Sequence, residues 1–343
     1  MADVVRRLAA AIVTALLALC VPGIVLAQAK QSWAKAEIKL VTDHGLMGGN
    51  AASFRPDTPL TRAALDDLVA GLTQTPPVAS GAPTAHVTIA GLDQRLVRSL
   101  GLSDDARLFY LGARAAGLQP PARFGTEVVA RLLALRKNRP AASDDLELLP
   151  NDVATRAEAA YSAAQILRFR GRETEAIEGA ATGFQLPQYT PWQQKILQTA
   201  VNLIGFPYVW GGTSTGAQTL FGVTSRGGFD CSGYIWRVFK LARYVGDEAL
   251  GRTIRGRTAA QMAAEAQRAQ RIPFAKLQPA DVMFFGLGGR RAGPAAIDHA
   301  GIYLGNGWMI NASRYGVALD RVADWSRERF AWGRRLLAEP GLA

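Results

Sequence analysis

The sequence predicts an α+β protein in which a mainly helical N-terminal part precedes a C-terminal domain that combines a helix with an antiparallel sheet. Apolar residues recur at helical spacing through much of the first part of the chain. Near the C-terminus the pattern changes to a strand-like alternation around Asn306-Gly307, a typical hairpin turn. The chain has 343 residues, of which 49% are hydrophobic, so it is long enough to form more than one core.

The charge balance is basic, with 39 Lys and Arg residues against 28 Asp and Glu residues and a formal net charge of +11. Such a balance favours anionic partners: nucleic acid, anionic lipid or anionic cell-wall polymer. The basic residues are scattered and are not interleaved with aromatic residues as in strand-binding proteins, so no nucleic-acid partner is expected. Two cysteines, three histidines and no Gly-rich phosphate loop give no pattern for a metal or a cofactor, and none is expected.

Residues 1–29 have the pattern of a secretory signal peptide. Two arginines precede an apolar run at residues 8–26, and small residues at Ala27 and Ala29 suit cleavage after either. The alternative is an uncleaved N-terminal anchor, since residues 8–26 are just long enough to span a bilayer. Cleavage would remove one of the two cysteines and leave Cys231 without an intramolecular disulfide partner. We therefore expect an exported protein, with no stable membrane insertion after cleavage.

Residues 30–188 are predicted to form helices joined by loops. Apolar residues at helical spacing indicate a first helical unit at residues 30–72 and a second at residues 104–169. A stretch rich in Pro, Thr and Gly opens a linker predicted at residues 73–103, and a polar connector is predicted at residues 170–188.

Two passages within these units resemble each other. Each joins a Pro- and Asp-containing loop to a Thr-Arg-Ala helix start: Phe54-Arg55-Pro56-Asp57 before Leu60-Thr61-Arg62-Ala63, and Leu149-Pro150-Asn151-Asp152 before Ala154-Thr155-Arg156-Ala157. This arrangement resembles the S-layer homology module, a helical repeat that docks onto anionic secondary polymers of the bacterial cell wall. The resemblance implies that Arg62 and Arg156 contact such a polymer. The alternative is that Thr61 and Thr155 are ordinary N-caps, with Glu158 completing a capping box.

Residues 189–343 are predicted to form the C-terminal domain, which opens with a helix from Pro191. A Gly-containing loop precedes Cys231 and apolar residues at helical spacing follow it, so the cysteine is predicted at a helix N-terminus. There the helix macrodipole is expected to favour the thiolate and lower the pKa of the thiol. A nucleophilic thiol needs a base, and His299 is the one histidine that follows in this domain. The alternative for a lone cysteine is a small buried hydrophobic residue.

Residues 298–313 are predicted to form a β-hairpin that carries His299. The strand-like stretch after His299 ends at Asn306-Gly307, and a second strand-like stretch follows. A two-residue turn there pairs Ile302 with Asn311, which places the Asn311 amide near His299 but not directly opposite. A strand twist or offset would bring the amide oxygen to the imidazole and fix the tautomer and orientation of the ring, as in Cys-His-Asn hydrolases.

Four ordered motifs occur in this domain: Pro207-Tyr208-Val209-Trp210-Gly211-Gly212, Phe229-Asp230-Cys231-Ser232-Gly233, Leu277-Gln278-Pro279-Ala280-Asp281-Val282-Met283-Phe284-Phe285, and His299-Ala300-Gly301-Ile302-Tyr303-Leu304-Gly305. Together they resemble the NlpC family of cell-wall cysteine endopeptidases, over about Tyr189 to Gly341. The resemblance implies a papain-like α+β fold in which the nucleophile helix packs on an antiparallel sheet that carries the histidine. It also implies cleavage of peptidoglycan stem peptides, typically beside the γ-D-glutamyl linkage to the diamino acid.

The resemblance assigns roles to six residues. It implies Cys231 as nucleophile, His299 as general base, Asn311 as the third polar residue, Tyr208 beside the oxyanion, and Asp230 and Ser232 as contacts for the free amine end of the stem peptide. The segments at residues 213–227 and 286–297 are longer than is usual for the family. We expect the first to be a lid or specificity loop, and either to narrow the substrate range.

The leading interpretation is a secreted peptidoglycan hydrolase at the cell wall or cell surface, whose N-terminal part tethers it to the envelope. Its expected partners are stem peptides and an anionic wall polymer. Three alternatives stay open: a non-catalytic wall-binding or structural protein, a related amidase or acyltransferase with the same triad, and an N-terminal part that inhibits the enzyme instead of anchoring it.

Overall fold

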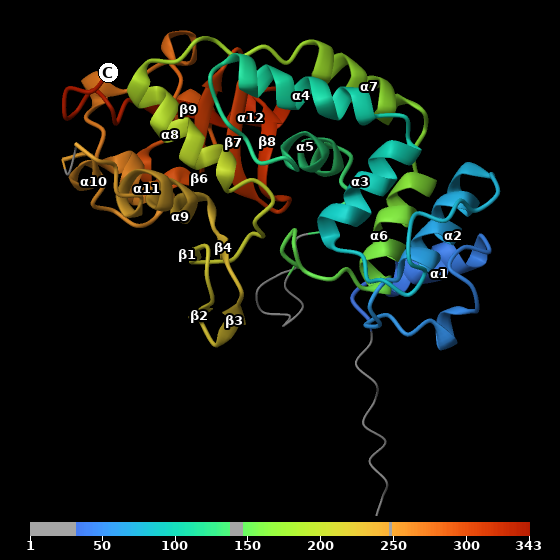
Figure 1. The fold of residues 1–343 in the computed structure, drawn as a ribbon. Coiled ribbons are helices and arrows are strands. Elements are labelled where there is room, and N and C mark those ends of the chain that lie inside the picture. Colours follow the sequence, from blue (N-terminus) through green and yellow to red (C-terminus); the bar gives the residue numbers. More distant parts are fainter. Residues whose placement is uncertain (1–31, 138–146, 247–248) are drawn as a thin grey trace, which may run out of the picture. The chain divides into compact units, whose positions relative to one another are not determined.

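The computed structural model describes residues 32–137, 147–246 and 249–343 (Figure 1). The predicted signal peptide lies outside these residues. Residues from Ser32 to Ala343 form one compact unit by their contacts. Helices occupy the first part of this unit and an antiparallel sheet lies in the second, so the predicted α+β class is confirmed. No helix within the described ranges is long and apolar enough to cross a membrane.

The N-terminal part is helical, as predicted. Its α-helices are α1 (Lys35–Asp43), α2 (Arg62–Thr73), α3 (Ile89–Ser99), α4 (Ser103–Ala115), α5 (Phe124–Leu132), α6 (Arg156–Leu167) and α7 (Arg172–Thr182). Thr61 caps α2 by accepting a hydrogen bond from the Ala64 N–H at 3.3 Å, and Thr155 caps α6 through the Glu158 N–H at 3.3 Å. The predicted N-caps are therefore confirmed.

Two segments that were expected as connections contain helices. Helix α3 lies within the predicted linker at residues 73–103, and α7 lies within the predicted connector at residues 170–188. The Pro- and Gly-rich signal is confined to the start of the linker, whereas residues from Ile89 onward place apolar side chains at helical spacing and bury them. The domain boundaries themselves stay predictions.

Helix α3 completes a three-part arrangement with α2 and α6. The residues before the three N-cap threonines form a closed ring of backbone hydrogen bonds: Leu60 N–H donates to Ala154 O at 2.8 Å, Ala154 N–H to Val87 O at 2.8 Å, and Val87 N–H to Leu60 O at 2.9 Å. Thr88 caps α3 through the Gly91 N–H at 3.2 Å, as its two counterparts cap their helices. The two predicted repeat passages therefore meet a third one at their helix N-termini.

The C-terminal part begins with helix α8 (Pro191–Asn202), which has the predicted Pro at its first position and a capping box from Thr190. Two small antiparallel strand pairs follow: β1 (Thr213–Ser214) with β4 (Gly228–Phe229), and between them in the chain β2 (Gln218–Leu220) with β3 (Val223–Ser225). Three short helices come next: α9 (Cys231–Trp236), α10 (Leu250–Thr253) and α11 (Ala259–Ala264). Helix α9 continues into a π-helical turn at residues 237–241.

The sheet is five-stranded and antiparallel, in the order β8-β7-β6-β5-β9. Its elements are β5 (Val282–Gly286), β6 (Ile297–Gly305), β7 (Trp308–Ser313), β8 (Gly316–Arg321) and β9 (Phe330–Arg334), with α12 (Asp324–Arg329) before the last strand. Helix α9 packs against β6 and β7, as the predicted fold requires. The sheet therefore separates the main core, which contains Phe284 and Ile302, from a second apolar cluster that contains Phe285 and Met309.

The β6–β7 hairpin turns at Asn306-Gly307, where both residues have positive φ, 50° and 78°. The predicted pairing of Ile302 with Asn311 is wrong. Asn311 pairs with Gly301, because an irregularity near the turn shifts the register by one residue. Since successive strand residues point to opposite faces, this shift puts Asn311 on the same face of the sheet as His299.

The helical part packs directly on the C-terminal domain. The Trp308 ring is 1% exposed and meets Phe109 of α4 edge-on at 5.9 Å. Helix α5 packs against β8, and its Arg131 donates hydrogen bonds to Gly205 O at 3.0 Å and to Tyr315 O at 2.5 Å. The C-terminal domain and the helical part therefore share buried contacts.

Candidate active site

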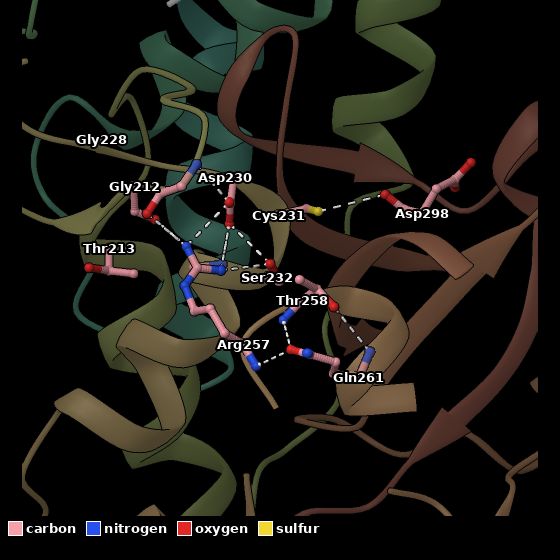
Figure 2. Close-up of polar contacts among 12 residues, drawn as sticks. Gly212, Thr213, Gly228, Asp230, Cys231, Ser232, Arg257, Thr258, Gln261 and Asp298 are labelled. Atoms are coloured by element: carbon pink, nitrogen blue, oxygen red, sulfur yellow. Dashed lines mark hydrogen bonds and ion pairs between the residues drawn. The ribbon is translucent and has the colours of Figure 1, made fainter. Parts of the chain in front are cut away.

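Cys231 is the first residue of α9, and Asp230 is the N-cap of that helix. The thiol donates to the carbonyl oxygen of Asp298 at 3.9 Å (Figure 2). The N–H of Ala300 donates to the same sulfur. The thiol of Cys231 therefore lies against the backbone on both sides of His299.

The predicted direction of the Cys231 pKa is wrong. Burial raises the pKa of the thiol to about 12, and the negative charge of Asp230 adds to this effect. Hydrogen bonds from the backbone of Ala300 and Ser232 lower the pKa but are outweighed. The residue is 8% exposed and α9 has six residues, so desolvation exceeds the contribution of the helix N-terminus. The resting thiol is neutral at neutral pH.

His299 and Asn311 are in direct contact. His299 Nε2 lies 2.9 Å from Asn311 Oδ1, and the Asn311 side chain is completely buried. Burial lowers the pKa of His299 to about 4, against the opposing effect of the Asn311 hydrogen bond. The imidazole is therefore neutral at neutral pH, and because Asn311 occupies Nε2, Nδ1 is the nitrogen available to a thiol.

Asp320 on β8 joins this pair, although no sequence motif indicated it. Asn311 Nδ2 donates to Asp320 Oδ2 at 2.6 Å. Because this carboxylate oxygen accepts from Nδ2, it orients the amide with Nδ2 toward itself and Oδ1 toward His299. Burial raises the pKa of Asp320, and the Asn311 hydrogen bond opposes that rise. The available sequence signal was a single acidic residue that closes the apolar run of β8.

A cavity of about 960 Å³ opens beside His299. His299 and Asp320 lie in its lining, and three exposed aromatic side chains contribute to its walls: Trp210 (63% exposed), Phe221 (80%) and Trp325 (45%). The Cys231 side chain is not part of the lining. The lining does include Asp298, whose carbonyl oxygen accepts a hydrogen bond from the Cys231 thiol.

The longer segment at residues 213–227 borders this cavity. Its β2–β3 hairpin contributes Leu220, Phe221 and Val223 to the lining. Phe221 is at the turn with φ of 52°, a left-handed conformation that is costly for a bulky residue. The role of this segment as a lid stays a prediction. The segment at residues 286–297 contributes nothing to the lining of the same cavity.

The three predicted substrate-binding residues lie close to Cys231. Tyr208 lines the cavity, and burial raises the pKa of its hydroxyl, with repulsion from Cys231, once that thiol is ionised, and from Asp230 adding to the rise. Asp230 and Ser232 are buried, and both bind the guanidinium of Arg257, which no sequence motif indicated (Figure 2). The predicted contacts of Asp230 and Ser232 with a stem peptide stay predictions.

The two predicted polymer-binding arginines differ in their surroundings. Arg156 donates to Phe54 O at 2.9 Å and to Met47 O at 2.8 Å, so its guanidinium holds a loop of the protein itself. Arg62 donates to Ser80 O at 2.9 Å and lines a separate cavity of about 300 Å³ with Arg95 and other residues. Polymer binding by both stays a prediction. In the part of the chain that the structure describes, His, Cys, Asp and Glu form no group of three or more that could hold a metal ion.

Two family models match the chain. The NlpC/P60 family matches residues 205–333, and the S-layer homology domain matches residues 28–65. The chain therefore carries an NlpC/P60 domain that contains the three candidate catalytic residues and an S-layer homology domain that contains Arg62. The NlpC resemblance is confirmed, as is the S-layer homology resemblance of the first passage, while that of the second passage, at residues 149–157, stays a prediction.

Curated relatives share part of the chain. It is 28% identical over 132 residues to the γ-D-glutamyl-L-lysine dipeptidyl-peptidase of Bacillus subtilis, covering 37% of this chain and 34% of that protein. It is 29% identical over 168 residues to the murein DD-endopeptidase MepH of Escherichia coli, covering 47% and 54%. The first match thus spans about a third of the Bacillus protein's length, and the second about half of the Escherichia protein's length.

A solved structure also aligns with the C-terminal part. RipD of Mycobacterium tuberculosis, a non-catalytic NlpC/p60 domain protein adapted to a peptidoglycan-binding function, covers 43% of this chain and 98% of its own. The two are 20% identical, with a TM-score of 0.32.

Proposed function

We propose that the protein is a secreted cysteine peptidase that cleaves peptidoglycan stem peptides, with the NlpC/P60 domain at residues 205–333 as its catalytic part. The observation that carries the proposal is that the Cys231 thiol contacts the backbone carbonyl of Asp298, the residue before His299, whose ring contacts Asn311 and through it Asp320. Both curated relatives are named as peptidases. The proposed scissile bond is the γ-D-glutamyl amide to the diamino acid.

The proposed reaction starts from a neutral thiol and a neutral imidazole. Burial raises the pKa of Cys231 to about 12 and lowers that of His299 to about 4. At neutral pH the proton therefore stays on sulfur in the free enzyme. We infer that transfer of this proton to Nδ1 of His299 accompanies attack on the substrate carbonyl and does not precede it.

Attack forms a bond between the Cys231 sulfur and the carbonyl carbon, and the carbonyl oxygen becomes an oxyanion. Backbone N–H groups at the start of α9 and the hydroxyl of Tyr208 are the proposed donors to this oxyanion. The imidazolium of His299 then gives its proton to the leaving amine as the C–N bond breaks. Water, deprotonated by His299, hydrolyses the resulting thioester and restores the thiol.

Asp320 is proposed as a positioning residue for His299. Through Asn311 its carboxylate keeps the ring proton on Nε2, which leaves the lone pair of Nδ1 free to accept the thiol proton. Replacement of Asp320 by Asn removes this selection, because an amide can present either its oxygen or its nitrogen to Asn311. We expect kcat/KM to fall about 10- to 100-fold and the His299 tautomer, observed by ring ¹⁵N NMR, to become mixed. A variant with wild-type kcat/KM and a single Nε2-protonated tautomer would refute this role.

The N-terminal part is proposed to hold the enzyme at the cell wall by binding an anionic polymer. The support is the S-layer homology match at residues 28–65 and the cavity that Arg62 shares with Arg95 and Arg98. Binding of the full chain to purified walls should fall when Arg62 is replaced by Ala. The matched control Arg172→Ala removes an exposed arginine of α7 and should leave wall binding unchanged.

The test of the enzymatic proposal is digestion of defined muropeptides followed by mass spectrometry. The wild-type protein should release a new free amine, whereas Cys231→Ala should release none and should still bind peptidoglycan. The products also distinguish an amidase or acyltransferase from an endopeptidase. A non-catalytic wall-binding protein is the second candidate, favoured by the raised pKa of Cys231 and its position outside the cavity lining. Absence of any product from the wild-type protein would select it.

A further inference from the structure

The turn between β7 and β8 forms part of the cavity beside His299. Ser313, Arg314 and Tyr315 lie in the lining of this cavity. The pair Ser313 and Gly316 closes the hairpin, so Arg314 and Tyr315 alone form the turn itself. An element that binds the backbone of so short a turn from outside the hairpin therefore fixes the position of this part of the cavity wall.

Arg131 of the helical part binds this turn. Helix α5, which carries Arg131, packs against β8 (Figure 1). The Arg131 Nη1 donates to the carbonyl oxygen of Tyr315 at 2.5 Å, and its Nη2 donates to the carbonyl oxygen of Gly205 at 3.0 Å. One guanidinium thus holds two backbone segments of the C-terminal domain, the β7–β8 turn and the segment that begins at Gly205.

The segment that begins at Gly205 carries Tyr208 into the cavity lining. On one side it is bound to β8, because the Gly205 N–H donates to Val317 O at 2.9 Å and the Val317 N–H donates to Phe206 O at 2.8 Å. On the other side Tyr208 forms a β-bridge with Phe229 of β4, the strand that leads into α9. The position of Gly205 therefore affects Tyr208 and the start of the nucleophile helix as well as β8.

The contact between α5 and these two segments is close enough to require glycine. A Cβ atom added to Gly316 would lie 2.7 Å from Arg131 Nη1, and one added to Gly205 would lie 2.8 Å from Glu127 Cδ. Both glycines also have positive φ, 71° and 92°, which other residues adopt at a cost. The cavity wall therefore has no space to move toward α5.

The guanidinium of Arg131 is itself oriented by the helical part. Its Nε donates to Glu127 Oε1 at 2.9 Å, its Nη1 to Glu147 Oε2 at 3.2 Å, and its Nη2 pairs with Glu147 Oε1 at 2.8 Å. All three side chains are buried, where charge-assisted hydrogen bonds are strong and directional. With the carbonyl oxygens of Gly205 and Tyr315, these acceptors engage every N–H group that an arginine side chain offers.

We propose that Arg131 is a positioning residue for the substrate cavity, which fixes the β7–β8 turn and the segment that carries Tyr208. The helical part is then a component of the substrate site, in addition to its proposed role at the cell wall. It supports substrate binding instead of inhibiting it. The inference rests on the proposed peptidase function, which supplies the occupant of the cavity, a stem peptide.

The test replaces Arg131 by Lys in the full-length protein and measures the Kd of a defined soluble muropeptide by calorimetric titration. Lysine keeps a positive charge beside Glu127 and Glu147. Its ammonium group has three donors and no planar fork, so Gly205 O and Tyr315 O lose their donors. A Cys231→Ala background prevents turnover. The Kd should rise about tenfold, which corresponds to the loss of about one hydrogen bond to the peptide.

Arg136→Lys in the same background is the matched control. The Arg136 side chain is as buried as that of Arg131 and shares the partner Glu147, to which its Nη2 donates at 2.9 Å. Its Nη2 also donates to Leu148 O at 3.1 Å, so both of these acceptors belong to the helical part. The control should lose stability as Arg131→Lys does, but it should leave the Kd unchanged. A titration separates the two effects, because unfolded protein lowers the stoichiometry and not the affinity.

Equal Kd values for Arg131→Lys and Arg136→Lys would overturn the inference, since the C-terminal contacts of Arg131 would then have no effect of their own. If Arg131→Lys does not fold, the double variant Glu127→Gln with Arg131→Gln, which removes one charge of each sign, is compared with the control by the same criterion. With Cys231 intact, a protein that binds the muropeptide without cleaving it would overturn the proposed function alone. A protein that neither binds nor cleaves it would overturn both.

Discussion

The raised pKa of Cys231 predicts an unreactive thiol in the free enzyme. The perturbation is pH, and the observable is the rate of alkylation by iodoacetamide. With a pKa of about 12, the thiolate fraction at pH 7 is about 10⁻⁵, whereas a free cysteine with a pKa of about 8.5 is about 3% ionised. Because the thiolate is the reacting species, the predicted rate at pH 7 is about three orders of magnitude below that of free cysteine.

The pH dependence separates ionisation from access to the buried sulfur. Poor access lowers the rate by the same factor at every pH and leaves the inflection at the ordinary thiol pKa. A raised pKa moves the inflection, so the logarithm of the rate should rise with unit slope from pH 7 to beyond pH 10. The protein in denaturant is the control and should react as free cysteine does. A plateau below pH 8, or a rate at pH 7 above that of free cysteine, would show that the pKa of Cys231 is not raised.

Three further predictions follow from burial and packing. The free energy of unfolding should decrease as the pH falls from about 6.5 to about 4, because unfolded His299 binds a proton that the folded residue excludes. Urea titrations should show a smaller decrease in His299→Gln, and an equal decrease in both proteins would contradict the lowered pKa of His299. A chain that starts at residue 189 should have a lower melting temperature than the full chain, since it exposes Trp308 and loses Arg131. The same melting temperature by calorimetry would contradict a stabilising contact between the helical part and the C-terminal domain. Gly233→Ala should destabilise the protein by about 3 kcal/mol or more, since its Cβ would lie 1.8 Å from a backbone oxygen. Gly179→Ala on α7, with open space around the Cβ, should instead stabilise the helix by about 0.5–1 kcal/mol. Similar urea midpoints for the two variants would contradict the close packing around Gly233.

Features that depend on neighbouring residues were predictable from the sequence. The N-cap roles of Thr61 and Thr155 and the turn at Asn306-Gly307 follow from local backbone chemistry, and the structure confirms them. The hairpin register was predicted one residue away from the observed one. An irregularity in strand pairing depends on what packs on the sheet, and the turn sequence does not encode it.

Features that depend on distant residues were not predictable. The sequence predicted a lowered pKa for Cys231 from its helix N-terminus, but burial is set by the packing of α9 on β6 and reverses the direction. Arg257 lies 27 residues from Asp230 in sequence and Asp320 reaches Asn311 across the β7–β8 strand pair, and no motif linked either of them to Cys231 or Asn311. The residue types of the candidate site were therefore predictable, while their charge states and supporting contacts required the fold.

Cys231 is proposed to attack the substrate and to carry the acyl group. Acid quenching during turnover of a defined muropeptide, followed by peptide mass mapping, tests this directly. A thioester intermediate should give a mass increase equal to the acyl fragment on the peptide that contains Cys231, absent from Cys231→Ala. Turnover with no adduct on that peptide, and undiminished in Cys231→Ala, would contradict nucleophilic attack by Cys231.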